Sequence, residues 1–183
     1  MTGIKNFQNR ILQKNYPDIK VQEITESANV GRSTFYRHYQ SKADVLIDFH
    51  KDMFEHLLKS MSTAESWLSQ TPPAELVLFL ERHMKLGTNP FSLSYKLGND
   101  LDYLMNNINQ QFSTIVEEKL QQAFAKKESS IPLPILAVSI STLYVGLFMS
   151  WFTKFQFIDA KQFATYLYRN VSAVVSEAIN NEA

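Results

Sequence analysis

Apolar residues recur along most of this chain at spacings of three and four, which is the pattern of amphipathic helices. Ile4, Phe7 and Ile11 are the first to show it. Breaks such as "NYPDI", "TPP", "GTNP" and "SSIPLP" interrupt it, because proline disfavours helix at the residue before it. No alternating pattern typical of strands competes. The predicted helices cover residues 4–14, 21–28, 32–39, 41–62, 74–86, 91–96, 99–127, 133–155 and 160–180.

These segments predict an all-α fold with about nine helices. The first three are short and are followed by a helix for which Ser41 and Asp44 form a capping-box variant. The remaining helices are mostly longer. We therefore expect two domains, a small one over residues 1–44 and a larger helical one over residues 45–183.

The stretch "GRSTFYRHYQSK" has an unusual mixture of aromatic and basic residues. On a helix over residues 32–39, Phe35 and Tyr39 share one face at i and i+4, which predicts a core face. The other positions can all donate hydrogen bonds and none is acidic, which suits phosphate oxygens and base edges. They are Arg32, Ser33, Thr34, Tyr36, Arg37 and His38.

The residues before this helix predict a tight turn. Asn29 is the best non-glycine residue for a left-handed backbone, Val30 would fill the angle between the helices, and Gly31 would be the N-cap. A short helix, a three-residue turn and a short polar-faced helix make a helix-turn-helix, whose second helix enters the DNA major groove.

The sequence "VQEITESANVGRSTFYRHYQSKADVL" resembles the N-terminal domain of TetR-type transcriptional regulators, over residues 4 to about 50. The resemblance implies DNA contacts by Thr34, Tyr36 and His38 and a phosphate contact by Lys42. It also places the start of the second helix at the DNA. With the residues found from the helix face, the predicted DNA-binding set is Lys20, Val21, Gln22, Arg32, Ser33, Thr34, Tyr36, Arg37, His38 and Lys42.

Three positions depart from the pattern of that family. Lys20 stands where a capping threonine is usual, so that cap is lost while a phosphate contact is gained. Thr25 stands for a small alanine, and Asn29 for the usual glycine. These changes leave the motif intact and bear on how the second helix is seated.

The helix over residues 133–155 is apolar all round and must be covered all round. A second copy of the chain would cover one stripe, and the resemblance implies a homodimer paired through the last two helices. Gly146 fits either a close helix crossing or simple tolerance. The predicted interface is Leu136, Ile140, Leu143, Leu147, Trp151, Phe163, Leu167, Val171 and Val174.

The larger domain is rich in aromatic residues, and such helical cores can open a pocket for a small apolar or aromatic effector. The resemblance implies an effector site in this part without giving its chemistry. For each polar candidate, a satisfied core or surface residue is the favoured interpretation over a ligand contact. The candidate lining residues are His83, Tyr103, Asn106, Tyr144 and Phe148.

Composition narrows the function further. Residues 1–42 carry a charge of +4 within a chain of zero net charge, a layout that favours a polyanion at that end. There is no cysteine, and His50 and His56 lack the i, i+4 spacing of a helical metal pair. No phosphate loop or catalytic triad is present. We expect no enzyme activity, cofactor or metal.

Residues 129–153 have no charge and are long enough to span a membrane. Their serines and threonines and the amphipathic rest of the chain favour a buried helix of a soluble, cytoplasmic protein instead. The predicted function is a ligand-responsive repressor that binds a palindromic operator in double-stranded DNA as a homodimer. The alternative is an activator, or a regulator controlled by a protein partner instead of a small molecule.

Overall fold

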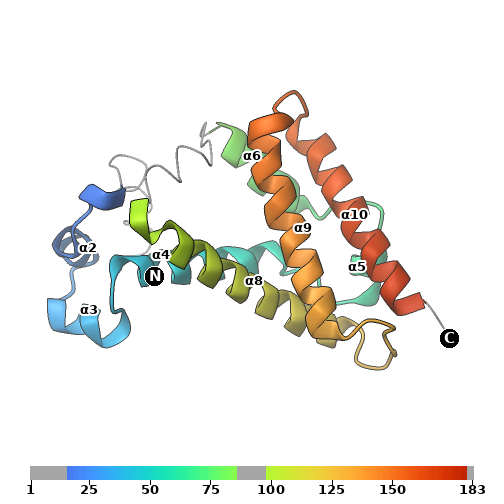
Figure 1. The fold of residues 1–183 in the computed structure, drawn as a ribbon, viewed down its shortest axis with the longest axis horizontal. Helices are drawn as coiled ribbons and strands as arrows, with labels where there is room; N and C mark the ends of the chain where they lie inside the picture. Colours follow the sequence, from blue (N-terminus) through green and yellow to red (C-terminus); the bar gives the residue numbers. More distant parts are fainter. Residues whose placement is uncertain (1–15, 86–97, 181–183) are drawn as a thin grey trace. The chain divides into compact units, whose positions relative to one another are not determined.

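The computed structural model describes residues 16–85 and 98–180, and all regular structure in these ranges is helical (Figure 1). This confirms the all-α prediction. The predicted helices over residues 4–14 and 91–96 lie outside the described residues. The observed elements are η1 (Tyr16–Asp18), α2 (Val21–Ala28), α3 (Arg32–His38), α4 (Lys42–Leu57), α5 (Ala64–Leu68), α6 (Ala74–Lys85), η2 (Gly98–Asp100), α8 (Leu101–Ala123), α9 (Leu133–Lys154) and α10 (Ala160–Asn180).

One helix was missed by the apolar spacing. The predicted helix over residues 41–62 ends at Leu57, and the separate short helix α5 follows. Thr63 caps α5, since its hydroxyl accepts from the Ser66 amide at 3.2 Å. Trp67 is fully buried and its indole N–H donates to the Met61 carbonyl at 2.9 Å. A threonine followed by a serine three positions later was the available signal.

The described residues divide between two compact units. Among the described residues, the first unit comprises residues 16–52 and 98–108, and the second comprises residues 53–85 and 109–180. Both α4 and α8 therefore contribute residues to each unit. The predicted domain boundary after residue 44 stays a prediction.

The first unit is built around the short helices α2 and α3, which contact each other. Ile24 of α2, Phe35 of α3 and Val45 of α4 are buried, and Leu104 adds a buried side chain from α8. This apolar centre holds the polar face of α3 in a fixed place, because burial of each large apolar side chain contributes about 1.5–3 kcal/mol.

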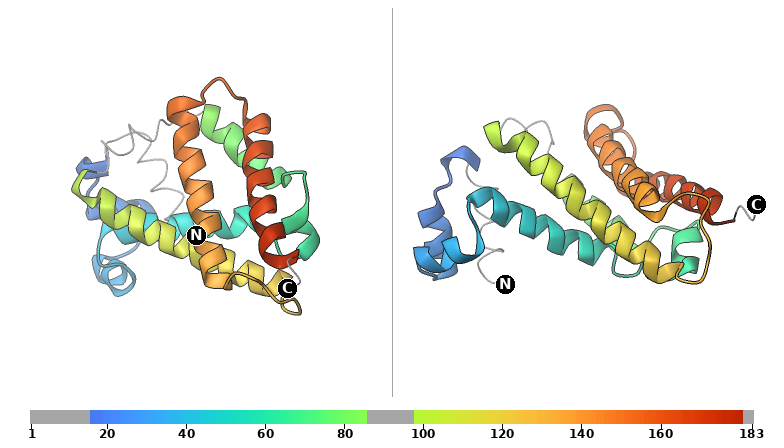
Figure 2. Two further views of the ribbon diagram at one scale, coloured as in Figure 1. Left: turned by 45° about the vertical axis from the view of Figure 1, so that its right-hand side comes forward. Right: turned by 60° about the horizontal axis from the view of Figure 1, so that its bottom comes forward.

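The second unit is centred on α10, which contacts α5, α6 and α9. Figure 2 shows α9 and α10 running side by side. Trp151 of α9 stacks on Phe163 of α10 with ring centroids 4.5 Å apart. Phe54 of α4 stacks on Phe112 of α8 at 4.1 Å. Each of these aromatic pairs packs two helices of this unit against each other.

By length and composition, α9 is the one helix among the described residues that could cross a membrane. One of its sides nevertheless forms protein core. Leu136 and Ile140 are fully buried and Trp151 is almost so. The Trp151 indole N–H also donates to the Ile158 carbonyl at 2.8 Å. The helix therefore contributes one of its sides to the protein core.

Candidate nucleic-acid interface

Helix α3 has a buried side and a polar side. Phe35 is 4% exposed, whereas Tyr36 is 56% exposed with its ring edge-on to Phe35 at 5.2 Å. Thr34 is half-buried, and α3 has no acidic residue. The exposed positions beside Tyr36 are Arg32, Ser33, Arg37 and His38. The structure thus brings the predicted recognition residues onto one accessible surface of hydrogen-bond donors.

The turn before α3 sets the direction of that surface. Asn29 has φ 53° and ψ 46°, the left-handed conformation predicted for it. Its amide donates to the Glu26 carbonyl at 3.1 Å, and the Val30 amide donates to the Thr25 carbonyl at 3.0 Å, which ends α2. Gly31 is the N-cap of α3, as predicted.

Two side chains near the turn lie differently from the prediction. Val30 is 41% exposed and does not fill the angle between the helices. Thr25 is buried instead, and its hydroxyl donates to the Gln22 carbonyl at 2.8 Å. A threonine in place of alanine is therefore accommodated by a bond within α2.

The end of α3 is tied to α4 by a tyrosine. The Tyr39 hydroxyl donates to Asp48 Oδ2 at 2.7 Å, and the Tyr39 ring lies 5.6 Å from that of Phe35. Burial, and then the hydrogen bond to Asp48, raise the pKa of Tyr39 to about 12. Phenylalanine would pack similarly but could not make this bond.

Replacing Tyr39 by Phe should lower the free energy of unfolding by about 1 kcal/mol at pH 7. The folded pKa of Tyr39 is raised above its ordinary value of 10.0. Its stabilisation is therefore complete below pH 10 and is lost as the pH rises through about 12. Urea unfolding of both proteins from pH 7 to 12 should show the difference shrinking above pH 10. A difference that stays constant would contradict the role of this hydroxyl.

The start of α2 presents the other predicted contacts. Lys20 and Gln22 are exposed and Val21 is half-buried. Lys20 is the N-cap residue without a side-chain cap, as predicted, and its backbone amide donates to Glu23 Oε1 at 3.4 Å. Lys20 and Gln22 thus stand free of the core at the end of α2 that the resemblance directs at DNA.

Lys42 does not present its ammonium group in the way predicted. Nζ donates to the carbonyls of Tyr16, Pro17 and Ile19 at 2.7, 3.1 and 3.0 Å. It also lies 4.4 Å from the centroid of the Tyr16 ring. An ammonium has three donors, so all are used within the chain. Burial lowers the pKa of Lys42. In this structure Lys42 braces α4 against the segment before α2, and its predicted phosphate contact stays a prediction.

Two tyrosine–aspartate bonds connect the start of α8 with the rest of the first unit. The Tyr16 hydroxyl donates to Asp100 Oδ2 at 3.0 Å, and the Tyr103 hydroxyl donates to Asp44 Oδ1 at 3.1 Å. Asp44 Oδ2 accepts the Ser41 amide at 2.8 Å, which confirms the capping role. Burial and Asp100 raise the pKa of Tyr16 well above its ordinary value.

The predicted effector residues are divided between the two units. Tyr103 and Asn106 are exposed residues of the first unit, whereas Tyr144 and Phe148 belong to the second. Tyr144 is buried edge-on against Phe112 with ring centroids 5.5 Å apart. The side chain of His83 lies outside the described residues. The five residues therefore do not line one site in a single unit.

Most of the predicted dimer residues lie inside the single chain. Because they are buried within the single chain, they are not accessible to a second copy. Leu143, Leu147 and Val174 are only half-buried. The buried members are Leu136, Ile140, Trp151, Phe163, Leu167 and Val171. Because α9 is apolar on every side, its sequence could not show which side of the helix faces the core of its own chain.

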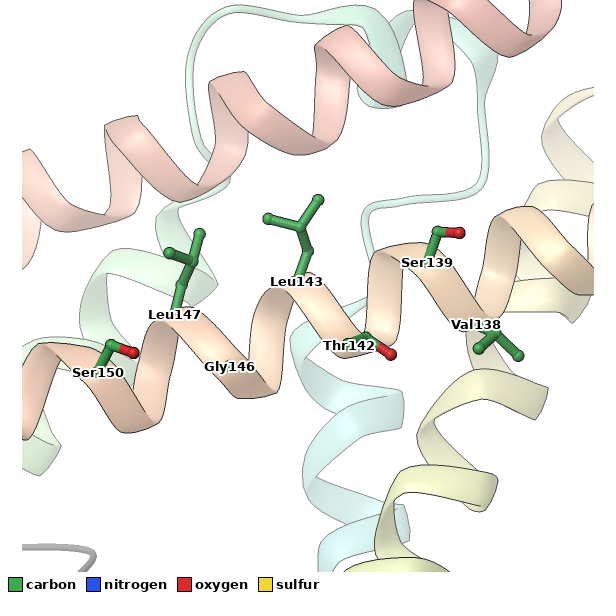
Figure 3. Close-up of a pocket in the computed structure, with 7 residues that line it drawn as sticks. All are labelled: Val138, Ser139, Thr142, Leu143, Gly146, Leu147 and Ser150. Atoms are coloured by element: carbon green, nitrogen blue, oxygen red, sulfur yellow. The ribbon is translucent and has the colours of Figure 1, made fainter.

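The opposite side of α9 carries a shallow, open groove. Its seven lining residues all project from this one helix (Figure 3). Val138 is 55% exposed, and Gly146 has nothing within 4 Å of the position where a Cβ would stand. The chain itself therefore gives no packing reason for this glycine. The lining is Val138, Ser139, Thr142, Leu143, Gly146, Leu147 and Ser150.

No group of three or more histidine, aspartate or glutamate side chains that could hold a metal ion occurs in residues 16–85 and 98–180.

Comparison with known proteins agrees with this geometry. Residues 11–49 match the model of a family described as bacterial regulatory proteins, tetR family. A TetR transcriptional regulator from Streptococcus agalactiae 2603V is 24% identical, with 93% of this chain and 91% of that chain covered and a TM-score of 0.50. A putative TetR-family transcriptional regulator from Syntrophomonas wolfei is 14% identical, with 95% and 93% covered and a TM-score of 0.57.

A putative TetR-family regulator from Rhodococcus sp. is 17% identical, with 94% of this chain and 96% of that chain covered and a TM-score of 0.55. The search of curated proteins found no match. At these identities the solved structures establish the fold, and the match over residues 11–49 establishes the domain that contains α2 and α3. Residues 11–49 therefore match the DNA-binding domain model of the tetR family, and the chain as a whole shares the fold of solved TetR-family transcriptional regulators.

Proposed function

We propose that the chain is a repressor that binds a palindromic operator in double-stranded DNA through the exposed face of α3. The exposed residues Tyr36, Arg37 and His38 of α3, a helix without any acidic residue, carry the proposal. Members of this family are DNA-binding regulators without enzyme activity. The protein would act in the cytoplasm, where its operator is accessible.

The exposed side of α9 supports a homodimer. Ile135 and Val138 are more than half exposed, and no side chain of α9 is charged before its last residue, Lys154. The small residues of the groove would let a second α9 approach closely, which would explain the glycine at position 146. Two copies related by two-fold symmetry would present two α3 helices to the two half-sites of a palindrome.

DNA binding is tested with duplexes enriched from a random pool by the wild-type protein. We expect a palindromic consensus and an affinity that falls steeply with salt, because Lys and Arg displace counterions from phosphates. Failure to enrich any sequence, or an affinity that does not change with salt concentration, would contradict the proposal.

Replacing Tyr36 by Ala should weaken operator binding by about tenfold, since one lost base contact costs roughly 1–3 kcal/mol. Folding should be unaffected, because Tyr36 is an exposed residue. Tyr166→Ala removes a comparably exposed tyrosine from α10 and serves as the control. Fluorescence anisotropy with the enriched duplex measures both variants. Equal affinities for both would show that α3 does not read the DNA through Tyr36.

We also propose that a small apolar or aromatic effector controls this binding from within the second unit. Phe148 lies 5.8 Å from Phe79 and 5.0 Å from Phe152, ring centroid to ring centroid, and all three are half-buried. Among the described residues, Asn109 Oδ1 and Gln111 Oε1 are buried acceptors without a hydrogen-bond partner. A ligand with an apolar body and a donor group would match these features.

Repression and ligand control are separated by a reporter gene fused to the enriched operator. Deletion of the regulator should raise expression, and an effector should both raise the melting temperature and weaken operator binding. A fall in expression on deletion would indicate an activator instead. If no compound in an aromatic and aliphatic library changes the melting temperature, control by a protein partner becomes the better proposal.

A further inference from the structure

The exposed side of α2 and α3 carries a chain of three hydrogen-bonded polar side chains. Arg32 Nη2 donates to Gln22 Oε1 at 3.3 Å, and Gln22 Nε2 donates to Glu26 Oε1 at 2.8 Å. All three residues are exposed. These two hydrogen bonds therefore link the first residue of α3 with two successive turns of α2, on the side of the predicted DNA contacts.

The chemistry of the three groups fixes the direction of this chain. A carboxylate can only accept hydrogen bonds, and a guanidinium can only donate them. Glu26 therefore takes the NH₂ group of Gln22, which turns the amide oxygen of Gln22 toward Arg32. A charged acceptor also polarises the amide and strengthens its oxygen as the next acceptor. Glu26 thus acts on Arg32 without touching it.

Arg32 needs such support at its position. It is the first residue of α3, where the positive end of the helix dipole disfavours a cation, and α3 has no acidic residue in its first turn to offset this. The Gln22 oxygen uses one of five guanidinium donors and leaves the others for a ligand. A guanidinium held in one orientation suits the paired acceptors O6 and N7 of guanine.

We infer that Glu26 is a positioning residue for DNA recognition, which through Gln22 holds Arg32 for contact with a base edge. This role rests on the proposed function. An acidic side chain near DNA would otherwise only repel the phosphates, so removing it would tighten binding to every duplex equally. A positioning role instead affects the preference for one base pair over another. Sequence preference, and not affinity alone, distinguishes the two roles.

The test uses the full-length protein, the duplex enriched by the wild type and a set of its single-base-pair variants. Arg32→Ala identifies the base pair at which preference depends on Arg32. Glu26→Ala and Gln22→Ala should each lower the preference at that base pair by about fivefold or more, the loss expected for one misplaced bidentate contact. Glu26→Gln keeps an oxygen that can accept from Gln22, so it should retain the preference although the negative charge is gone.

Two controls isolate the effect. Glu55→Ala removes the same charge from an exposed position of α4 and should leave the preference unchanged. In an Arg32→Ala background, Glu26→Ala should have no further effect on preference, because the group that it positions is absent.

Each other result would overturn the inference. A preference that survives Glu26→Ala, or that Arg32→Ala leaves intact at every base pair, would show that the three side chains do not read DNA together, while the proposed function would stand. If Glu26→Ala and Glu26→Gln change the base-pair preference equally, Glu26 acts through its negative charge and not by accepting the hydrogen bond of Gln22. If the wild type enriches no duplex, the proposed function fails and the positioning role fails with it.

Discussion

A variant with Glu at both Val138 and Leu147 should be a monomer that binds the enriched operator at least about 100-fold more weakly than the wild type. Both residues line the groove of α9, where Val138 is exposed and Leu147 is half-buried. Two unpaired carboxylates in a helix–helix contact would have to be desolvated, which costs several kcal/mol per ion. In the free monomer the Glu at position 138 stays in water and the Glu at position 147 is half-exposed, so circular dichroism first checks that the variant is folded.

Light scattering gives the mass, and anisotropy with the full palindrome and with one half-site gives the two affinities. The variant should lose its advantage on the full palindrome while its half-site affinity stays that of the wild type, because α3 is untouched. Leu78→Glu is the matched control, since Leu78 is 63% exposed on α6 and outside the groove. A double variant that remains dimeric would show that α9 does not pair through this side.

The helical elements could be read from sequence because they depend on local interactions. Asn29 with its left-handed backbone, Gly31 as an N-cap and the Ser41–Asp44 cap are each decided within a few residues. The buried and exposed faces of α3 could also be predicted from residue spacing, because Phe35 marks the buried face at the centre of the helix. Short α5 escaped because its five residues are too few to show a period.

The parts that depend on long-range contacts could not be predicted. The bond of Tyr103 with Asp44 joins residues 59 positions apart, so no local pattern in the sequence could show it. A helix that is apolar all round, as α9 is, gives no sign of which side the chain itself will cover. The sequence therefore indicated a dimer through α9 but placed it on residues such as Leu136 and Ile140, which are core.

The hydrogen bonds that link Glu26, Gln22 and Arg32 also depend in part on a contact that the sequence pattern could not show. Gln22 and Glu26 stand at i and i+4 on α2, a spacing that predicts a contact. The bond from Arg32 to Gln22 crosses the turn and depends on the angle between α2 and α3. Only the folded turn, with Asn29 in its left-handed conformation, brings the two helices into that relation.

Lys42→Met should lower the free energy of unfolding by about 2 kcal/mol, because the carbonyls of residues 16, 17 and 19 lose a charged donor. Methionine keeps most of the volume of the side chain, so loss of packing contributes little. Operator binding should decrease only in proportion to the fraction of the protein in which the first unit is unfolded. Urea unfolding followed by circular dichroism measures the stability, and the salt dependence of operator affinity measures the number of phosphate contacts.

Lys20→Met is the matched control, since Lys20 is an exposed residue at the start of α2. Its stability should remain within about 0.5 kcal/mol of the wild type. If Lys20 contacts a phosphate, the slope of log affinity against log salt should fall by about one. Lys42→Met should show the reverse, a loss of stability with an unchanged slope. An unchanged stability with a reduced slope would mean that Lys42 leaves its three carbonyls for the DNA backbone, as the family resemblance implies.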